Sequence, residues 1–273
     1  MYYHHHKTSN PSQSMFHRHI HSDYEMLYFE RGDAEFIVEG SVCRLKRGDL
    51  LLIRPRTYHY LHLRSESAYE RYVINFTEEE IGECEICIEP DREYVIYSIS
   101  ENSVVSGFFK TWGEYDEMFT AEDRERYVNG GLRTVLSVLK YCKGQNGDEL
   151  DRSKDTLKGI LRFIDANIEE PINAEILANE FYVSSSWLAH VFRSHLGISL
   201  MRYINQKKML YAQQLIWQGA PPTEVAVRCH FENYATFYRQ YKKILGRSPK
   251  EDKGNIATHK INTIGMKDGY LED

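Results

Sequence analysis

Two stretches in the C-terminal part of the chain repeat each other, and this repeat constrains the fold more than any other feature. They read "LANEFYVSSSWLAHVFRSHLG" and "VAVRCHFENYATFYRQYKKILG", and they align at an offset of 48 to 49 residues. Each has an alanine (Ala178, Ala226) after its first apolar residue and a basic residue three positions before a Leu-Gly end. A short helix with a small buried residue, a tight turn and a second helix with exposed polar side chains form a helix-turn-helix. The repeat therefore predicts two such units.

The charge pattern indicates what these units bind. Residues 181–250 hold ten basic and only two acidic side chains, a net charge of +8, whereas the whole chain carries −6 and residues 1–154 carry −8. A local basic block is expected of a surface that binds phosphates. One unit alone would be better explained as an ordinary helical bundle. Two units joined by a helix can reach major-groove faces about 34 Å apart, so the sequence predicts binding to double-stranded DNA.

Helical patterns extend upstream of the repeat. Asn173 and Ser184 are predicted N-caps of the first two short helices, and Leu196-Gly197 predicts a helix end. Residues 104–142 have helical spacing, with an apolar stripe that either packs on its own domain or on a second copy: Leu132, Val135, Leu136 and Leu139. The polar segment "KGQNGDELDRS" that follows predicts a linker.

The N-terminal part has a different pattern. From Met15 to about Phe76, short apolar and aromatic runs alternate with Arg-Gly-Asp and Glu-Gly turns, which predicts an all-β barrel or sandwich. The five scattered cysteines fit a reducing compartment better than a disulfide framework. The single C-x2-C pair, Cys84 and Cys87, is more simply read as two neighbouring surface cysteines than as a zinc site.

The C-terminal region is similar to a known family. Residues 157–250 resemble the DNA-binding domain of the AraC/XylS transcriptional regulators, through "INAEILANEFYVSSSWLAHVFRSHLGISLMRYINQKKMLYAQQLI" and "PTEVAVRCHFENYATFYRQYKKILGRSP". The chain departs from the family pattern at Pro222, at His230 in place of a glycine, at Lys208 in place of an arginine, and in the ending "KEDKG". The resemblance implies a DNA-contacting set, which comprises Ser185, Ser186, Ala189, His190, Arg193, Asn233, Tyr234, Ala235, Tyr238, Arg239 and Lys242.

Within this set the side-chain chemistry suggests different roles. Arg239 is expected to read guanine with both arms of its guanidinium. Arg193 and Lys242 are expected to contact phosphates, which position a protein on DNA without specifying a sequence.

The N-terminal segment resembles a cupin of the sensor type. The first cupin motif, H-x-H-x3-E-x6-G, begins at His19, and "GDLLLIRPRTYH" matches the second. In metal-binding cupins the matching positions form the ligand set, which here would be His19, His21, Glu25 and His59. Two histidines two positions apart in a strand point the same way, and imidazoles with a carboxylate suit a divalent transition metal.

Three interpretations of these side chains stay open. The first is an effector pocket without metal, formed by His19, His21, Tyr24, Glu25, Tyr28 and His59. The second is a bound metal on the four ligands, and the third is a purely structural role. No cofactor is predicted with certainty.

We therefore expect a two-domain chain: an N-terminal all-β cupin barrel followed by helices, and a C-terminal all-α double helix-turn-helix domain. The expected parts are the effector-binding barrel at 12–90, a coupling or dimerisation region at 91–142, a linker at 143–154, the DNA-binding domain at 155–253 and a flexible tail at 254–273. The predicted protein is a cytoplasmic regulator and not an enzyme. It would sense a sugar or related metabolite and act as an activator.

Its predicted partners are double-stranded promoter DNA, a small-molecule effector, the transcription machinery and a second copy in a homodimer, with no membrane. Two alternatives remain. A cupin metalloenzyme acting on a sugar or small metabolite would leave the C-terminal repeat unexplained. A DNA-binding protein whose cupin is only a dimerisation module would respond to no ligand.

Overall fold

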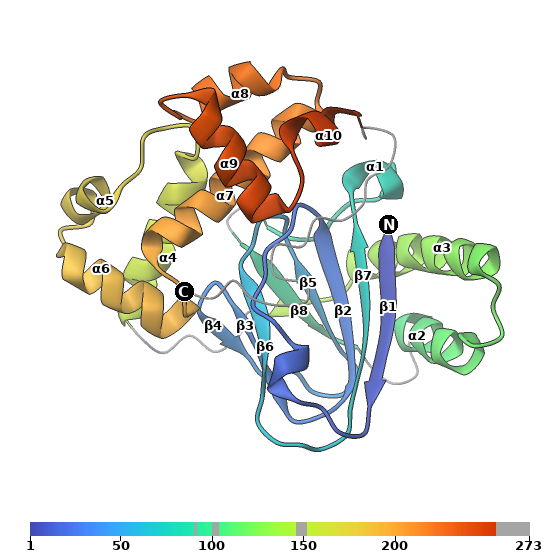
Figure 1. Ribbon diagram of the computed structural model, residues 1–273. Coiled ribbons are helices and arrows are strands. Elements are labelled where there is room, and N and C mark those ends of the chain that lie inside the picture. Colours follow the sequence, from blue (N-terminus) through green and yellow to red (C-terminus); the bar gives the residue numbers. More distant parts are fainter. Residues whose placement is uncertain (90–91, 100–103, 146–151, 255–273) are drawn as a thin grey trace. The chain divides into compact units, whose positions relative to one another are not determined.

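A computed structural model describes residues 1–89, 92–99, 104–145 and 152–254 (Figure 1). The described chain divides into two compact units, which we treat separately. The first consists of Met1–Arg18 and Asp23–Asp148, and the second lies within Glu149–Asp273, with the short segment His19–Ser22 grouped to it. The predicted tail after residue 254 and residues 146–151 of the predicted linker lie outside the described residues.

The first unit contains two antiparallel sheets. The larger sheet has the strand order β1-β7-β2-β5-β8-β9, and the smaller has the order β4-β3-β6. The strands are β1 (Tyr2–Thr8), β2 (Tyr24–Arg31), β3 (Ala34–Val38), β4 (Ser41–Cys43), β5 (Asp49–Ile53), β6 (His59–Leu63), β7 (Tyr69–Phe76), β8 (Tyr94–Ser98) and β9 (Gly144–Gln145). The prediction of an all-β N-terminal domain is confirmed, in the form of a two-sheet sandwich.

The sandwich is larger than the predicted 12–90. Strand β1, which was not predicted, pairs with β7 along its whole length, from Tyr2 opposite Asn75 to Thr8 opposite Tyr69. At the other end β8 pairs with β5. The histidines at positions 4 to 6 are therefore part of the larger sheet.

Side-chain alternation along the strands creates two separate cores. On β2, Leu27 and Phe29 belong to a core shared by strands of both sheets, which therefore lies between them. The alternate residues Met26 and Tyr28 belong to a second core on the opposite face of the larger sheet. This division follows from the two-residue period of a strand.

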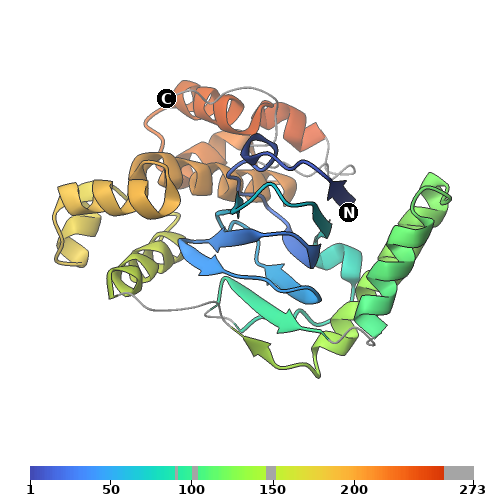
Figure 2. The same cartoon turned by 90° about the horizontal axis from the view of Figure 1, so that it is seen from below.

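Two helices cover that opposite face (Figures 1 and 2). They are α2 (Val104–Tyr115) and α3 (Ala121–Leu139), and a short α1 (Glu78–Ile81) precedes them. All four residues of the predicted apolar stripe on α3 are at most 1% exposed and pack in this core. The stripe is thus used within its own unit, which decides between the two alternatives that the sequence left open.

The second unit is helical, as predicted. Its elements are α4 (Arg152–Ala166), α5 (Ala174–Glu180), α6 (Ser185–Val191), a π-helical turn η2 (Phe192–Leu196), α7 (Leu200–Trp217), α8 (Pro222–Arg228), α9 (Tyr234–Leu245) and α10 (Pro249–Gly254). Asn173 and Ser184 cap α5 and α6 by accepting hydrogen bonds from backbone N–H groups, as expected. Helix α7 connects the pair α5–α6 to the pair α8–α9 (Figure 1). No helix in the described ranges is both long and apolar enough to span a membrane.

The two helix-turn-helix units use the same turn. In the first, the N–H of Val183 donates to the carbonyl of Ala178 at 3.0 Å, and in the second the N–H of Phe231 donates to the carbonyl of Ala226 at 3.0 Å. The residue before the donor has a left-handed backbone in both, with φ of +53° at Tyr182 and +57° at His230. The repeat in sequence is therefore a repeat of backbone hydrogen bonding, and His230 keeps the turn where the family has glycine.

A buried carboxylate ties the last helix to the rest of the second unit. Asp252 on α10 is fully buried and accepts hydrogen bonds from Gln213 on α7 at 2.9 Å and from the hydroxyl of Tyr241 on α9 at 2.6 Å. Arg247 pairs with it at 3.0 Å. The unusual ending "KEDKG" thus forms a helix that belongs to the core of the domain.

Candidate functional site

The second helix of each repeat presents a polar face to solvent. All eleven residues of the predicted DNA-contacting set are exposed: Ser185, Ser186, Ala189, His190 and Arg193 around α6, and Asn233, Tyr234, Ala235, Tyr238, Arg239 and Lys242 around α9. The opposite sides of the same helices carry Leu188 and Phe237, which are fully buried. Each helix is therefore held by its apolar side while its polar side remains open for a large partner.

Two members of the set already make local contacts. Asn233 is the N-cap of α9, and its Oδ1 accepts the backbone N–H of Thr236 at 2.9 Å. One guanidinium nitrogen of Arg239 lies 3.3 Å from the hydroxyl of Thr236. A guanidinium has five N–H donors, so Arg239 keeps enough of them for a base edge. Asn233 has a structural role in addition to any contact with DNA.

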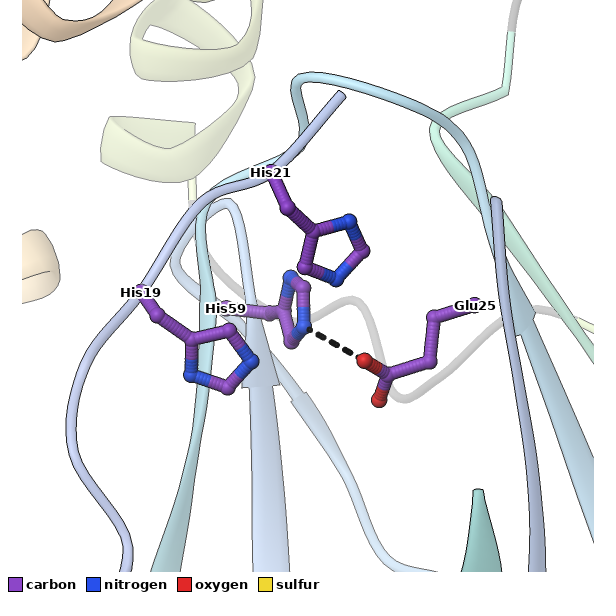
Figure 3. Close-up of side chains that lie close together, drawn as sticks. All are labelled: His19, His21, Glu25 and His59. Carbon is purple, nitrogen blue, oxygen red and sulfur yellow. Dashed lines mark hydrogen bonds and ion pairs between the residues drawn. The ribbon is translucent and has the colours of Figure 1, made fainter. Parts of the chain in front are cut away.

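The four predicted cupin ligands lie together in the first half of the chain (Figure 3). His19 and His21 precede β2, Glu25 is on β2, and His59 begins β6. One ligand atom of each side chain lies within 4.8 Å of those of the others. His21, Glu25 and His59 are at most 5% exposed, and His19 is 9% exposed. The sequence motif thus assembles into a real cluster.

Hydrogen bonds fix the orientation of two of these groups. Nδ1 of His59 lies 2.8 Å from the carbonyl oxygen of Thr57, which can only accept, so Nδ1 carries a proton. Nε2 then lies 3.4 Å from a carboxylate oxygen of Glu25. The amide of Asn75 donates to the same oxygen at 3.2 Å. An imidazole with a protonated Nδ1 has its lone pair at Nε2, which here faces the Glu25 carboxylate and is available to a cation.

This arrangement fits a divalent transition metal. Three imidazoles and one carboxylate are ligands that zinc, iron, nickel and manganese accept. A metal-binding histidine normally donates its other N–H to a carbonyl or carboxylate, which is what His59 does with Thr57. A bound metal would supply a positive charge that an electron-rich ligand oxygen can contact.

Two residues of the predicted effector pocket do not reach this cluster. Tyr24 stacks on Phe76 and donates its hydroxyl to Glu78 at 2.9 Å. Tyr28 stacks on Phe109 of α2 with 4.4 Å between ring centroids. Both belong to the core beneath the helices, because they alternate with Glu25 along β2 and point to the opposite face. The structure therefore does not bring Tyr24 and Tyr28 together with Glu25.

Sequence reasoning also missed Asn75. It is 4% exposed and bonds to Glu25 from the neighbouring strand β7. The signal was present in "YVINF", where one polar residue interrupts an apolar strand. Cys84 and Cys87 are free, half-buried thiols. The one group of potential metal ligands found within the described ranges does not include them.

Two family models match the two units. The description "AraC-like ligand binding domain" matches residues 6–95, and "Helix-turn-helix domain" matches residues 177–254. The chain belongs to the AraC family of transcriptional regulators. This AraC-family protein therefore combines a ligand-binding sandwich with a DNA-binding helical domain, as the sequence predicted.

Curated relatives agree with this assignment. The chain is 30% identical over 114 residues to the putative HTH-type transcriptional regulator YkgA of Escherichia coli K12, which is 41% of this chain and 47% of that protein. It thus spans about half the length of that relative. The HTH-type transcriptional activator RhaS of Escherichia coli O81 is 19% identical over 245 residues, 88% of both chains. Both names describe transcriptional regulators, and the family assignment does not support the rival prediction of a metalloenzyme.

Among solved structures, ToxT from Vibrio cholerae O395 is 14% identical and covers 93% of this chain and 97% of its own, with a TM-score of 0.40. An AraC-type DNA-binding regulator from Chromobacterium violaceum is 25% identical over 40% of this AraC-family chain and 97% of its own, with a TM-score of 0.38.

Proposed function

We propose that this AraC-family protein acts in the cytoplasm as a transcriptional activator, binding promoter DNA through α6 and α9 in response to a small molecule in its sandwich. The observation that carries the proposal is the double unit with two exposed polar helices, set in a block of net charge +8. Activation is supported by the relative RhaS, which is named a transcriptional activator. We propose a sugar or related metabolite as effector.

The effector site in this proposal is the cluster of His19, His21, Glu25 and His59, with Asn75 added. Its buried polar groups suit hydroxyl and carbonyl oxygens of a small ligand. A metal on the four ligands is compatible with the same role. Ligand binding shifts an equilibrium only if the ligand prefers one of two states of the protein. The helices α2 and α3 share a core with the sheet that carries Glu25 and Asn75, which supports a role for residues 104–142 in coupling.

A homodimer and contact with the transcription machinery remain part of the proposal. The apolar stripe of α3 is buried in the core of its own unit. The proposed dimer would therefore form through another surface. Analytical ultracentrifugation over a range of concentrations tests the dimer directly. A monomer at all concentrations, with and without DNA, would refute it.

The experiment that tests the regulator is selection of genomic DNA fragments by the purified full chain at fixed salt, with and without added divalent metal. We expect an enriched motif whose two half-sites lie about one helical turn apart. Binding that is blind to sequence and lost with added salt would contradict the proposal, because phosphate contacts alone behave in this way. Effector sensing is then tested by thermal shift with a sugar panel, since a ligand of the folded state raises Tm.

A further inference from the structure

A second polar cluster lies in the first unit, away from the histidine and glutamate ligands. The guanidinium carbon of Arg71 on β7 lies 5.3 Å from the ring centroid of Phe16, 5.8 Å from that of Tyr69 and 5.9 Å from that of Phe36. His6 on β1 pairs in register with Arg71 and packs edge-on against Phe16. A cationic head is thus enclosed by aromatic rings from three segments of the chain.

Three buried polar atoms of this cluster have no partner at ordinary hydrogen-bond geometry, although Arg71 lies close enough to the Tyr69 hydroxyl to act on it. They are Nε of Arg71, the hydroxyl of Tyr69 and Nε2 of His6. The whole Tyr69 side chain is 0% exposed. Within the described ranges no carboxylate pairs with Arg71, because the adjacent Glu70 contacts His5 and Arg31 instead. A buried polar group without a partner costs about 1–3 kcal/mol, so these three groups on neighbouring strands suit a polar ligand group.

The protonation of these groups defines the charge of the cluster. Burial raises the pKa of Tyr69 to about 12, so its hydroxyl keeps its proton and can donate. Burial, together with Arg71, lowers the pKa of His6 to about 4, so its ring is neutral near pH 7. His4 and His5 are the other ionisable groups that act on His6, and Arg71 is the cation facing it. The cluster therefore offers one positive charge and several hydrogen-bond donors.

We propose that Arg71, with the Tyr69 hydroxyl and His6, binds the carboxylate group of a small organic acid, at a second ligand site of the sensor domain. This inference rests on the proposed sensor function and names the chemical class of a second ligand. A guanidinium matches a carboxylate with two parallel N–H bonds. One positive charge balances a monoanion better than a phosphate dianion. The rings of Phe16, Phe36 and Tyr69 lie around the guanidinium and offer apolar contacts to the carbon skeleton next to that carboxylate.

The Arg71 cluster is distinct from the histidine cluster. Arg71 is four residues from Asn75 on β7, which corresponds to about 13 Å along a strand. Val73, between them on the same face, belongs to the core of the sandwich. The two clusters thus lie at different levels of the same strand, and anion binding can be tested without reference to any metal.

The test uses the full chain and matched pairs of probes: glucuronate against glucose, benzoate against benzamide, and hexanoate against hexanamide, with glucose 6-phosphate as the phosphate arm. Thermal shift at constant ionic strength identifies a responding probe, and calorimetry measures its affinity. We expect a carboxylate to raise Tm and its neutral counterpart to have no effect. No response to any carboxylate, or a larger response to the phosphate, would overturn the inference.

Two variants locate the site, and a third is the control. Arg71→Met is expected to weaken carboxylate binding roughly tenfold to hundredfold, the equivalent of a charge-assisted hydrogen bond. Tyr69→Phe should weaken it less, because it removes one neutral donor and leaves the charge of Arg71 in place. Arg47→Met removes an exposed arginine that pairs with Glu30, and binding should be unchanged. Full affinity in Arg71→Met, or a response to neutral sugars alone, would refute carboxylate recognition while leaving the DNA-binding regulator intact.

Discussion

Tyr182 and His230 occupy equivalent positions in the two helix-turn-helix turns, 48 residues apart, and both have a left-handed backbone. Tyr182 is 96% exposed, and His230 is also exposed. Neither side chain is driven into this conformation by burial. The turn itself imposes it, because the next N–H must reach back to the carbonyl of Ala178 or Ala226.

We predict that glycine at either position stabilises the DNA-binding domain. A left-handed non-glycine residue destabilises the folded state by about 1–2 kcal/mol. Glycine removes this strain, but its greater freedom in the unfolded chain lowers the gain by about 0.4–1 kcal/mol. Tyr182→Gly and His230→Gly should each gain up to about 1 kcal/mol in urea unfolding. Gly219→Ala is the reverse control, since Gly219 has φ of +97° and open space around it. A loss of stability in both glycine variants would contradict the argument.

Adjacent glycines in α3 should respond in opposite ways to alanine. A Cβ on Gly131 would lie 2.0 Å from a ring carbon of Phe108 on α2, whereas a Cβ on Gly130 would meet nothing within 4 Å. Gly130→Ala should stabilise the protein by about 0.5–1 kcal/mol, and Gly131→Ala should destabilise it by about 1–3 kcal/mol. Thermal unfolding of the two variants measures the difference. Equal effects would mean that α2 and α3 do not pack closely at this point.

Arg239→Ala should weaken specific DNA binding by about 1–3 kcal/mol and relax sequence preference at one base pair. Fluorescence anisotropy with the selected operator and a panel of single-base variants, at fixed salt, measures both effects. Lys110→Ala on the exposed side of α2 removes a charge in the other unit and should change neither. If Arg239→Ala weakens binding equally to all sequences, Arg239 contacts phosphate and not a base.

Divalent metal should bind to the histidine cluster with one equivalent per chain. His59→Ala should abolish metal binding and Glu25→Gln should weaken it strongly, because each of the four side chains would be a ligand of the same metal ion. Calorimetry with zinc and with manganese on metal-free protein gives stoichiometry and affinity. His62→Ala, three residues along on the exposed side of β6, is the matched control. Equal loss in His62→Ala would place the metal elsewhere.

The free energy of unfolding should decrease as the pH falls from about 6.5 to about 4, because of the buried His6. Its pKa is about 4 in the folded chain against an ordinary value of 6.5, through burial and the facing Arg71, with His4 and His5 adding smaller effects. Below about pH 6.5 the unfolded chain takes up a proton that the folded chain refuses, so stability decreases until about pH 4. His6→Gln should make urea unfolding less dependent on pH in this window. An unchanged pH dependence would show that His6 is not neutral when folded.

Much of the helical domain was predictable because its signals are local. The caps at Asn173 and Ser184 and the Leu-Gly ends depend on short-range hydrogen bonds that follow from residue type. The ligand motif was equally readable, since His19, His21 and Glu25 are close in the chain. His59 was placed with them by its resemblance to a motif and not by any local rule.

The remaining features depend on contacts between distant segments. Strand β1 is defined by β7, about 65 residues away, and the unpartnered state of Arg71 appears only when the sandwich is assembled. The separation of Tyr24 and Tyr28 from the histidine cluster was predictable, since alternation from Glu25 places both side chains on the other face of β2. The packing partner of the α3 stripe was not predictable, because an apolar face has the same sequence pattern whether it packs inside its own chain or against a second copy.

The buried Asp252 determines where the helical domain can be cut. A fragment that stopped at Leu245-Gly246, the end of the second repeat, would leave Gln213 and Tyr241 facing a cavity without their common acceptor. Such a fragment is expected to unfold readily. Its low stability would then suggest, wrongly, that the DNA-binding domain depends on the sensor domain. A fragment carried through Gly254 retains this acceptor. It offers a fair comparison of DNA affinity with and without the sensor.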